Sequence, residues 1–285
     1  MNRKMKKILL DTDIGCDIDD ALALTYLLKN PECELLGITT VSGDVQLRAK
    51  ICSMICRHEN NTVSIRTGEK TSLKNIREAE FPQQSERLCM YPHNTEFEGD
   101  AVGFMKDIIE KNPGQVTLLA IGPLTNIAKL FIKHPDTARK LEQIYIMGGK
   151  FFGEETLEWN IKFDPHAAKI VFETAVKKLT IIGLDVTLSF FLTRDEIYKK
   201  IVNAPILKQL SRDWFNNISD KIYFHDPLTT ALIFNENLCD CITGTAYINM
   251  DTFCTVFKPG TGVHHIAANV NIKNFYSSFF DIINR

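Results

Sequence analysis

The alternation of short apolar runs with segments of helical periodicity constrains the fold of this chain more than any other feature. Repeated strand–helix units predict an open, mostly parallel sheet flanked by helices on both faces. Because no repeat, low-complexity tract or Pro/Gly-rich linker interrupts the pattern, we expect a single α/β domain with a Rossmann-like core over residues 1–285. The expected strands are 7–10, 35–41, 63–66, 116–121, 143–147 and 179–184, and the expected helices between them are 21–30, 45–57, 99–111, 124–133 and 165–175.

Two parts of the chain depart from this alternation. Residues 67–98 show no clear period, which predicts a long surface loop or insertion. Later, helical segments follow one another before a strand-rich portion and a last helix. These later segments are 194–203, 205–217, 227–236, the strand-rich 242–257 and 264–271, and a helix from Ile272.

Composition and charge exclude several classes of protein. Hydrophobic residues at 45%, charged residues at 24% and a net charge of −2 predict a soluble globular protein with no nucleic-acid partner. No apolar stretch approaches the length of a membrane span, and the run Ile8–Leu10 is too short for a secretory signal. Eight cysteines without an export signal indicate reduced thiols and a cytoplasmic location.

Acidic or glycine residues follow the expected strands. Because the carboxyl ends of parallel strands lie at one edge of a sheet, we expect these residues to gather at a ligand-binding rim. The residues that follow the strands are Asp11, Ser42-Gly43-Asp44, Gly122, Gly148-Gly149 and Asp185.

The densest cluster of acids is the run from Asp11 to Asp20, which holds five carboxylates in ten residues. Asp17 or Asp19 is in position to cap the following helix, but capping uses one carboxylate. Like charges packed at a strand end are costly unless a cation neutralises them, and oxygen ligands favour Ca²⁺ or Mg²⁺. The run also begins like an EF-hand loop, but the glutamate that such a loop needs is replaced by Leu22. We therefore predict a metal site here.

Five segments in order resemble the inosine–uridine-preferring nucleoside hydrolase family, over about 220 residues. A single acidic cluster is a weak signal, whereas five ordered segments are a strong one. The resemblance implies the nucleoside hydrolase fold. The five segments are Asp11-Thr-Asp13 with Asp19-Asp20-Ala21, Gly37 to Asp44, Gly122 to Ala128, Met147 to Gly149 with Glu158-Trp-Asn160, and His225-Asp-Pro-Leu228.

The resemblance also implies a set of metal ligands and sugar contacts. Carboxylates of Asp13, Asp20 and Asp226 and the backbone carbonyl of Thr125 would bind Ca²⁺, with two ribose hydroxyls and a water completing the shell. Contacts to the ribose 2′- and 3′-hydroxyls are expected from Asp19 and Asp44. The 5′ end of the sugar is expected to lie against Glu158 and Asn160.

Cleavage of the N-glycosidic bond builds positive charge on the sugar ring, and the departing base needs a proton or a stacking partner. Asp13, in contact with both metal and water, is the expected general base. His225 and Tyr223 are candidates for assisting the leaving group, and Trp214 or Phe152 for stacking on it. His93 is a further candidate to face the base. Each of these side chains can also have a structural role alone.

Three departures from the family's usual pattern leave the substrate range open. Two extra residues lie between Gly15 and the Asp19-Asp20 pair, and Asp44 stands where asparagine is usual. The segment between Gly149 and Glu158 is short and lacks an expected asparagine. The preferred nucleobase is therefore left open. By resemblance we expect a homodimer or homotetramer.

The predicted function is Ca²⁺-dependent hydrolysis of ribonucleosides to ribose and free base, as in nucleoside salvage. One alternative is a catalytically silent nucleoside- or Ca²⁺-binding paralogue. Another is a Mg²⁺ phosphohydrolase of the haloacid dehalogenase type. That class needs Thr or Val where Gly15 stands, and it explains neither Glu158 and Asn160 nor the His225-Asp226 pair.

Overall fold

The computed structural model describes residues 5–74 and 79–285, so residues 1–4 and part of the segment 67–98 lie outside the described residues. Its centre is a nine-stranded sheet in the order β10-β9-β11-β6-β5-β4-β1-β2-β3. Neighbouring strands from β11 to β3 run parallel, whereas β9 is antiparallel to both β11 and β10. The strands are β1 (Lys6–Thr12), β2 (Cys33–Thr40), β3 (Ile65–Thr67), β4 (Val116–Ala120), β5 (Gln143–Met147), β6 (Leu179–Ile182), β9 (Cys239–Ile248), β10 (Thr255–Pro259) and β11 (His264–Val270).

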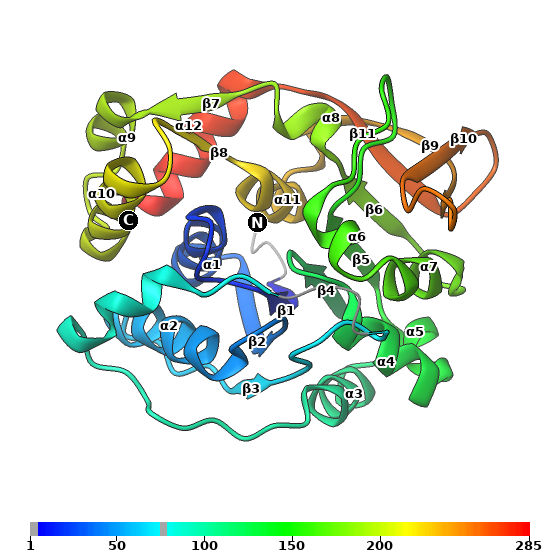
Figure 1. Ribbon diagram of the computed structural model, residues 1–285, viewed down its shortest axis with the longest axis horizontal. Helices are drawn as coiled ribbons and strands as arrows, with labels where there is room; N and C mark the ends of the chain where they lie inside the picture. Colours follow the sequence, from blue (N-terminus) through cyan, green and yellow to red (C-terminus); the bar gives the residue numbers. More distant parts are fainter. Residues whose placement is uncertain (1–4, 75–78) are drawn as a thin grey trace.

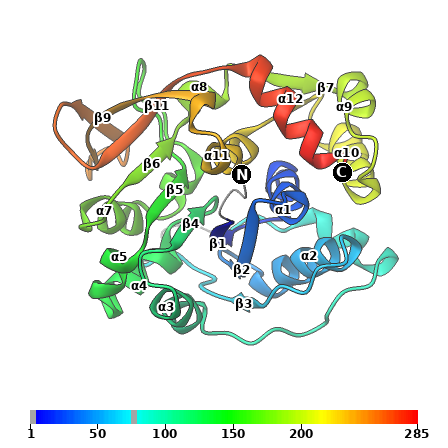
Figure 2. The ribbon, with the colours of Figure 1, turned by 180° about the vertical axis from the view of Figure 1, so that it is seen from behind.

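Helices cover both faces of the sheet, as Figures 1 and 2 show from opposite sides. Side chains of β1 alternate between two apolar cores, because successive residues of a strand point to opposite faces: Ile8 and Leu10 pack into one core and Leu9 into the other. The helices are α1 (Asp19–Lys29), α2 (Val45–His58), α3 (Ala101–Lys111), α4 (Thr125–Lys133), α5 (Pro135–Lys140), α6 (Trp159–Phe163), α7 (Pro165–Glu173), α8 (Leu184–Thr187), α9 (Arg194–Lys200), α10 (Pro205–Asn217), α11 (His225–Phe234) and α12 (Ile272–Ile283).

The α/β fold class with a mostly parallel sheet is confirmed, and the carboxyl ends of the parallel strands meet at one edge. In register, Asp11 lies beside Thr39 of β2 and Ala120 of β4, and Ile146 of β5 lies beside Ile181 of β6. Within residues 67–98 the described part holds one 3-10 helix, η1 (Gln83–Met90), that the sequence does not signal. A two-stranded sheet of β7 (Phe191–Thr193) and β8 (Lys221–Tyr223) and the short 3-10 helix η2 (Glu236–Leu238) complete the elements.

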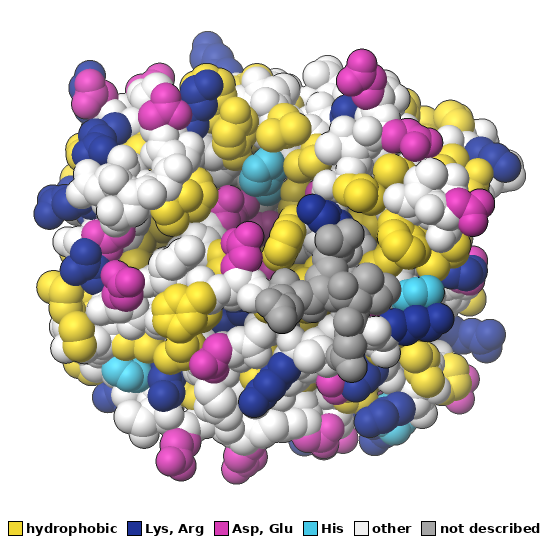
Figure 3. Space-filling view, in the orientation of Figure 1, with side chains coloured by type: hydrophobic (Ala, Val, Ile, Leu, Met, Phe, Trp, Pro, Cys, Tyr) yellow, Lys and Arg dark blue, Asp and Glu magenta, His cyan; other side chains and the backbone are white. Residues whose placement is uncertain are grey.

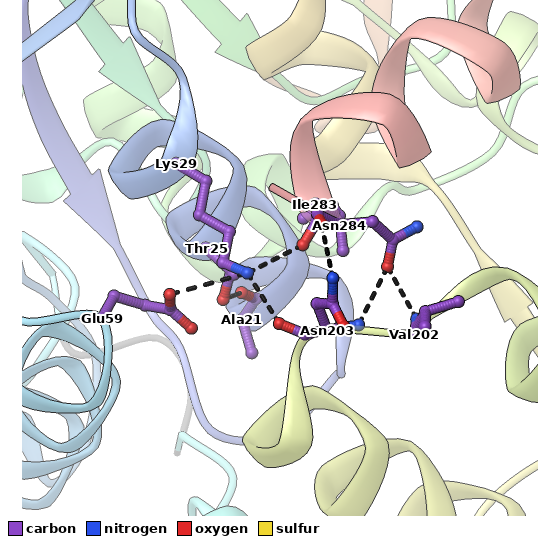
Figure 4. Close-up of polar contacts among 8 residues, drawn as sticks. All are labelled: Ala21, Thr25, Lys29, Glu59, Val202, Asn203, Ile283 and Asn284. Carbon is purple, nitrogen blue, oxygen red and sulfur yellow. Dashed lines mark hydrogen bonds and ion pairs between the residues drawn. The ribbon is translucent and has the colours of Figure 1, made fainter.

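The mostly buried side chain of Lys29 joins the last helix of the chain to α1. The Lys29 ammonium donates to the carbonyl oxygens of Asn203, at 2.8 Å, and Ile283, at 2.9 Å (Figure 4). Beside it, the Asn284 side-chain oxygen accepts from the Val202 amide at 2.6 Å (Figure 4). These contacts join the last turn of α12 to the end of α1 and to the loop before α10. Across residues 5–74 and 79–285, no helix combines the length and apolar character needed to cross a bilayer.

Candidate active site

A cavity of about 450 Å³ lies where the parallel strands end. Acidic side chains and a histidine gather at a hollow near the centre of this face in Figure 3. Most of the site residues that the sequence predicts come together here, from segments more than 200 residues apart. Those that line the cavity are Asp13, Asp19, Asp20, Glu158, Asn160, Trp214, His225 and Asp226.

Three buried carboxylates form the centre of the cavity wall. Asp19 and Asp20 occupy the first turn of α1, and Asp226 occupies the first turn of α11. The two helix starts meet, since the Asp226 amide donates to Asp19 Oδ2 at 3.1 Å. Asp19, Asp20 and Asp226 each offer an oxygen within 4.8 Å of the others, and this oxygen-only group is suited to a hard cation. Neither Asp17 nor Asp19 caps α1, because Ile18 takes the N-cap position without a side-chain bond.

Electrostatics in this group favour a cation. Burial raises the pKa of Asp19 to about 7, and burial together with repulsion by neighbouring carboxylates raises the pKa of Asp20 and of Asp226 well above the usual range. The partial positive charge at the two helix N-termini offsets some of this cost. Thr12 donates its hydroxyl hydrogen to Asp20. Three adjacent buried carboxylates still need a counter-charge to ionise together.

Asp13 follows β1 directly and lines the same cavity. Burial raises the pKa of its carboxyl to about 6, against the opposing effect of the Arg48 guanidinium. A carboxylate that titrates near neutral pH is suited to accepting a proton from water. Asp11 lies outside the cavity lining; its Oδ1 accepts from Asn126 Nδ2 at 2.8 Å and from the Thr39 hydroxyl, which ties β1 to α4 and β2.

Glu158 and Asn160 line the cavity at the start of α6. The Glu158 carboxylate accepts from the amides of Gly149, Asn160 and Ile161, at 3.0, 2.8 and 3.0 Å. Asn160 Nδ2 donates to the carbonyl oxygens of Met147, at 3.1 Å, and Ile121, at 3.2 Å. These bonds fasten α6 to the ends of β4 and β5 and so fix this wall of the cavity.

His225 faces the cavity from the start of α11. Its Nδ1 lies 2.7 Å from the hydroxyl oxygen of Thr187. Burial lowers the pKa of the imidazole, and the carboxylate of Asp17 acts in the opposite direction. Tyr223 lies outside the cavity lining and stacks on the His225 ring, with ring centroids 5.6 Å apart. Trp214 lines the cavity, and its indole nitrogen donates to the Lys221 carbonyl at 2.7 Å.

Two further residues predicted to contact the metal or the sugar are not among those that line the cavity. Thr125 is fully buried in the first turn of α4, where its hydroxyl donates to Asp164 Oδ2 at 2.8 Å; from this segment it is Ile121 that lines the cavity. Asp44 is exposed and caps α2, where its carboxylate accepts from the Leu47 amide at 3.0 Å. The capping bond turns the Asp44 side chain to its own helix.

Phe152 and His93 also lie outside the cavity lining. Phe152 packs edge-on against Phe257, with ring centroids 5.9 Å apart, and the His93 Nδ1 lies 2.9 Å from the Tyr91 carbonyl oxygen. Local packing accounts for both aromatic side chains.

Several cavity residues escape prediction from the sequence. Asp17 lies within the acidic run, so its charge was visible, but its position in the cavity depends on the conformation of the loop. Burial and repulsion by Asp19 raise the pKa of Asp17 to about 8. Glu80 and Gln83 belong to the aperiodic segment, which gives no periodic signal. The cavity residues not predicted are Cys16, Asp17, Glu80, Gln83, Ile121, Met147, Leu157, Trp159, Leu184 and Ile218.

Comparison with known proteins extends these observations. The family described as inosine-uridine preferring nucleoside hydrolase matches residues 8–276. Uridine nucleosidase 1 of Arabidopsis thaliana is 30% identical over 274 residues, which cover 88% of this chain and 80% of that protein. The non-specific ribonucleoside hydrolase RihC of Salmonella newport (strain SL254) is 33% identical over 202 residues, 67% of this chain and 65% of that protein.

A solved structure shares the fold as well. The purine-preferring ribonucleoside hydrolase from Gardnerella vaginalis superposes with a TM-score of 0.85 at 24% identity, covering 98% of each chain. The family match and the similarity to a uridine nucleosidase exclude the phosphohydrolase alternative. Because the family match spans most of the chain and relatives that share its sequence bear the same class of activity, this chain belongs to the inosine–uridine preferring nucleoside hydrolase family and is an N-ribosyl hydrolase.

Proposed function

We propose that this enzyme uses Ca²⁺ to hydrolyse ribonucleosides to ribose and free base, in nucleoside salvage. The observation that carries the proposal is the group of buried carboxylates formed by Asp19, Asp20 and Asp226, with oxygens within 4.8 Å of one another. The group is made of oxygen donors, which favour a hard ion over zinc or copper. Ca²⁺ accepts six to eight oxygens in flexible geometry, which suits a site built from two helix starts and a loop.

Asp13, Asp20 and Asp226 are the proposed carboxylate ligands, and Asp19 the proposed contact to a ribose hydroxyl. For the backbone carbonyl we prefer Ile121 to Thr125, because Ile121 lines the cavity and Thr125 lies inside α4. The bound ion would supply positive charge that fixes the sugar diol and acidifies a water. Since the Asp44 carboxylate caps α2, it is not retained as a sugar contact.

Residues of the chain itself perform the remaining chemistry. Asp13 accepts the proton of the attacking water, and its buried carboxyl with a raised pKa is suited to that step. The carboxylate wall stabilises the positive charge that develops on the ring as the bond to the base breaks. His225 is the proposed proton donor to the leaving base. Glu158 and Asn160 form the wall expected to hold the 5′ end, and Trp214 offers an aromatic surface.

Uridine is the first substrate to test, because the Arabidopsis thaliana relative is named a uridine nucleosidase, whereas the Gardnerella vaginalis enzyme is named purine-preferring. Assembly as a homodimer or homotetramer and a cytoplasmic location stay predictions from the sequence.

The test is release of free base from a panel of ribonucleosides, before and after EDTA and again after Ca²⁺ or Mg²⁺ is added. We expect EDTA to abolish release and Ca²⁺ to restore it. Restoration by Mg²⁺ alone would contradict the choice of ion. Base release that EDTA leaves unchanged would overturn the proposal that the enzyme requires a metal ion. Nucleoside binding without base release, in folded protein with Ca²⁺ present, would support a silent binding paralogue.

A further inference from the structure

We propose that Arg48 is a positioning residue that holds Asp13, and the loop after it, in the geometry that hydrolysis requires. Arg48 lies on α2, outside the cavity lining, and the residue is 1% exposed. The inference rests on the proposed function, because it takes Asp13 as the general base.

All five guanidinium hydrogens of Arg48 have acceptors, and four of these acceptors are backbone carbonyls. Nε donates to Ser42 O at 2.7 Å. Nη1 donates to Ile14 O at 2.9 Å and to Asp13 O. Nη2 donates to Glu80 O at 3.3 Å and to Cys16 Sγ at 3.6 Å.

These acceptors belong to three segments that are far apart in the sequence. One is the loop of residues 13–16 after β1, the second is the turn after β2 at Ser42, and the third is the segment at Glu80. Two of the three contribute cavity residues, namely Asp13, Cys16 and Glu80. The guanidinium therefore joins the acidic loop to the segment at Glu80, which also lines the cavity.

The loop after β1 needs such a support from outside. Gly15 has φ of 128°, in the region that favours glycine, and a Cβ there would lie 2.5 Å from the Pro82 side chain. The Gln84 amide donates to the Gly15 carbonyl at 3.0 Å, and the Cys16 thiol donates to the Phe81 carbonyl at 3.5 Å. The loop is thus held by side contacts and not by a strand or helix of its own.

A permanent positive charge beside a proposed cation site needs an explanation, because burying an arginine is expensive and its charge repels a metal ion. The fork geometry of the guanidinium provides one, since it binds several carbonyls at once and is pre-organised to do so. A lysine would bring the same charge with three donors on a flexible stem. The fork geometry is therefore the property that a lysine cannot reproduce at this site.

The experiment compares Arg48→Lys, which keeps the charge, with Arg48→Met, which keeps only the stem. We expect kcat to fall about 100-fold in both, the loss typical of a misplaced catalytic group, with a much smaller change in KM. The matched controls are Arg57→Lys and Arg57→Met, since Arg57 is exposed on the same helix and donates to Asn94 Oδ1 at 2.9 Å. These controls are expected to keep the wild-type kcat.

Hydrogen–deuterium exchange without Ca²⁺ supplies a readout that does not depend on activity. In both Arg48 variants we expect faster exchange at the amides of residues 13–18 and 79–84, and unchanged exchange in the strands of the sheet. Guanidinium at millimolar concentration should restore part of the kcat of Arg48→Ala, whereas ammonium should not.

Wild-type kcat and wild-type exchange in Arg48→Lys would overturn the proposal. So would faster exchange over the whole chain with kcat falling in proportion to the folded fraction, because that result describes a stabilising residue only. If the wild-type protein hydrolyses no ribonucleoside, the proposed function fails, yet the exchange comparison still decides whether Arg48 anchors the loop.

Discussion

His225 Nδ1 lies 2.7 Å from the Thr187 hydroxyl oxygen, and the same oxygen lies 3.2 Å from the Gly183 carbonyl oxygen. The hydroxyl has one hydrogen, and the carbonyl can only accept, so the hydrogen points to Gly183. The Nδ1 of His225 must then donate, which leaves Nε2 as the nitrogen available to the cavity. A neutral ring in this tautomer carries no hydrogen on Nε2, so His225 can donate to the leaving base only as the imidazolium, which the Asp17 carboxylate favours and burial opposes. Thr187 thereby fixes the orientation of the proposed leaving-group acid.

Replacing Thr187 by valine tests this relationship. Thr187→Val keeps the shape but loses the bond, and a hydrogen bond is worth about 0.5–1.5 kcal/mol, or up to about tenfold in rate. We expect kcat to fall by about that factor with little change in KM, in steady-state assays of base release. Thr187→Ser keeps the hydroxyl and should retain most activity. Equal rates for the valine variant and the wild type would show that the hydrogen bond of Thr187 does not contribute to catalysis.

Asp13→Asn is expected to lose at least about 100-fold in kcat, because asparagine cannot accept the proton of water. The fold should survive, since a neutral amide removes a buried charge whose ionisation burial opposes. Circular dichroism and the Tm without Ca²⁺ check the fold. Near-normal turnover in this variant would mean that another residue is the general base.

The parallel core and its acidic edge could be predicted because both leave periodic signals. Apolar runs mark β1, β4 and β5. Charged residues that directly follow the strands of a parallel sheet lie at its carboxyl edge. For the same reason Asp13, Asp20 and Asp226, which sequence analysis assigns to one site, line one cavity, although more than 200 residues separate the first and last.

The predicted contacts that do not line the cavity depend on the conformation of loops and helix ends. The Asp44 carboxylate caps its own helix, and from the segment of Thr125 it is Ile121 that lines the cavity. Arg48 gave no signal, because a cation on the buried side of an amphipathic helix resembles an ordinary surface residue until the fold is known. Glu80 lies in a segment without periodicity.

The sugar is the subject of a third prediction. If the ion holds the ribose diol, removing the 2′-hydroxyl removes one of its ligands and leaves Asp19 without a partner. Deoxyuridine should therefore be hydrolysed far more slowly than uridine, with kcat/KM lower by at least about 100-fold. Initial rates on the two compounds under identical Ca²⁺ provide the measurement. Comparable rates would contradict the proposed contact between the ribose hydroxyls and the metal ion.

The pH dependence of stability follows from the raised pKa values. Burial raises the pKa of Asp13 to about 6, of Asp19 to about 7 and of Asp17 to about 8, from 3.8. The folded state thus binds more protons than the unfolded state, so this stability is present below about pH 4 and is lost as pH rises to about 8.

Without Ca²⁺, Tm should therefore fall between about pH 5 and pH 8, and excess Ca²⁺ should raise Tm more at the higher pH, where it does not compete with protons. Thermal denaturation at several pH values measures both effects. Asp17→Asn should flatten the dependence without Ca²⁺. A Tm that rises over this range in the wild type but not in Asp17→Asn would mean that folding lowers the pKa of Asp17, contrary to the prediction.

The last prediction concerns the junction in Figure 4, where α1 holds the end of the chain. Lys29 is 10% exposed at its side chain and donates to two carbonyl oxygens, of Asn203 and Ile283. Lys29→Met keeps most of the apolar stem but leaves both carbonyls without this charged donor, which should lower the free energy of unfolding by roughly 2 kcal/mol. Urea denaturation measures the loss.

Lys140→Met is the control, because Lys140 is 40% exposed and pairs with Glu110 on the surface, so a change within about 0.5 kcal/mol is expected there. The residual folded enzyme should keep its kcat, since the junction lies at the opposite end of α1 from Asp19 and Asp20. A loss no larger than that of the control would mean that α12 is held by its apolar face alone.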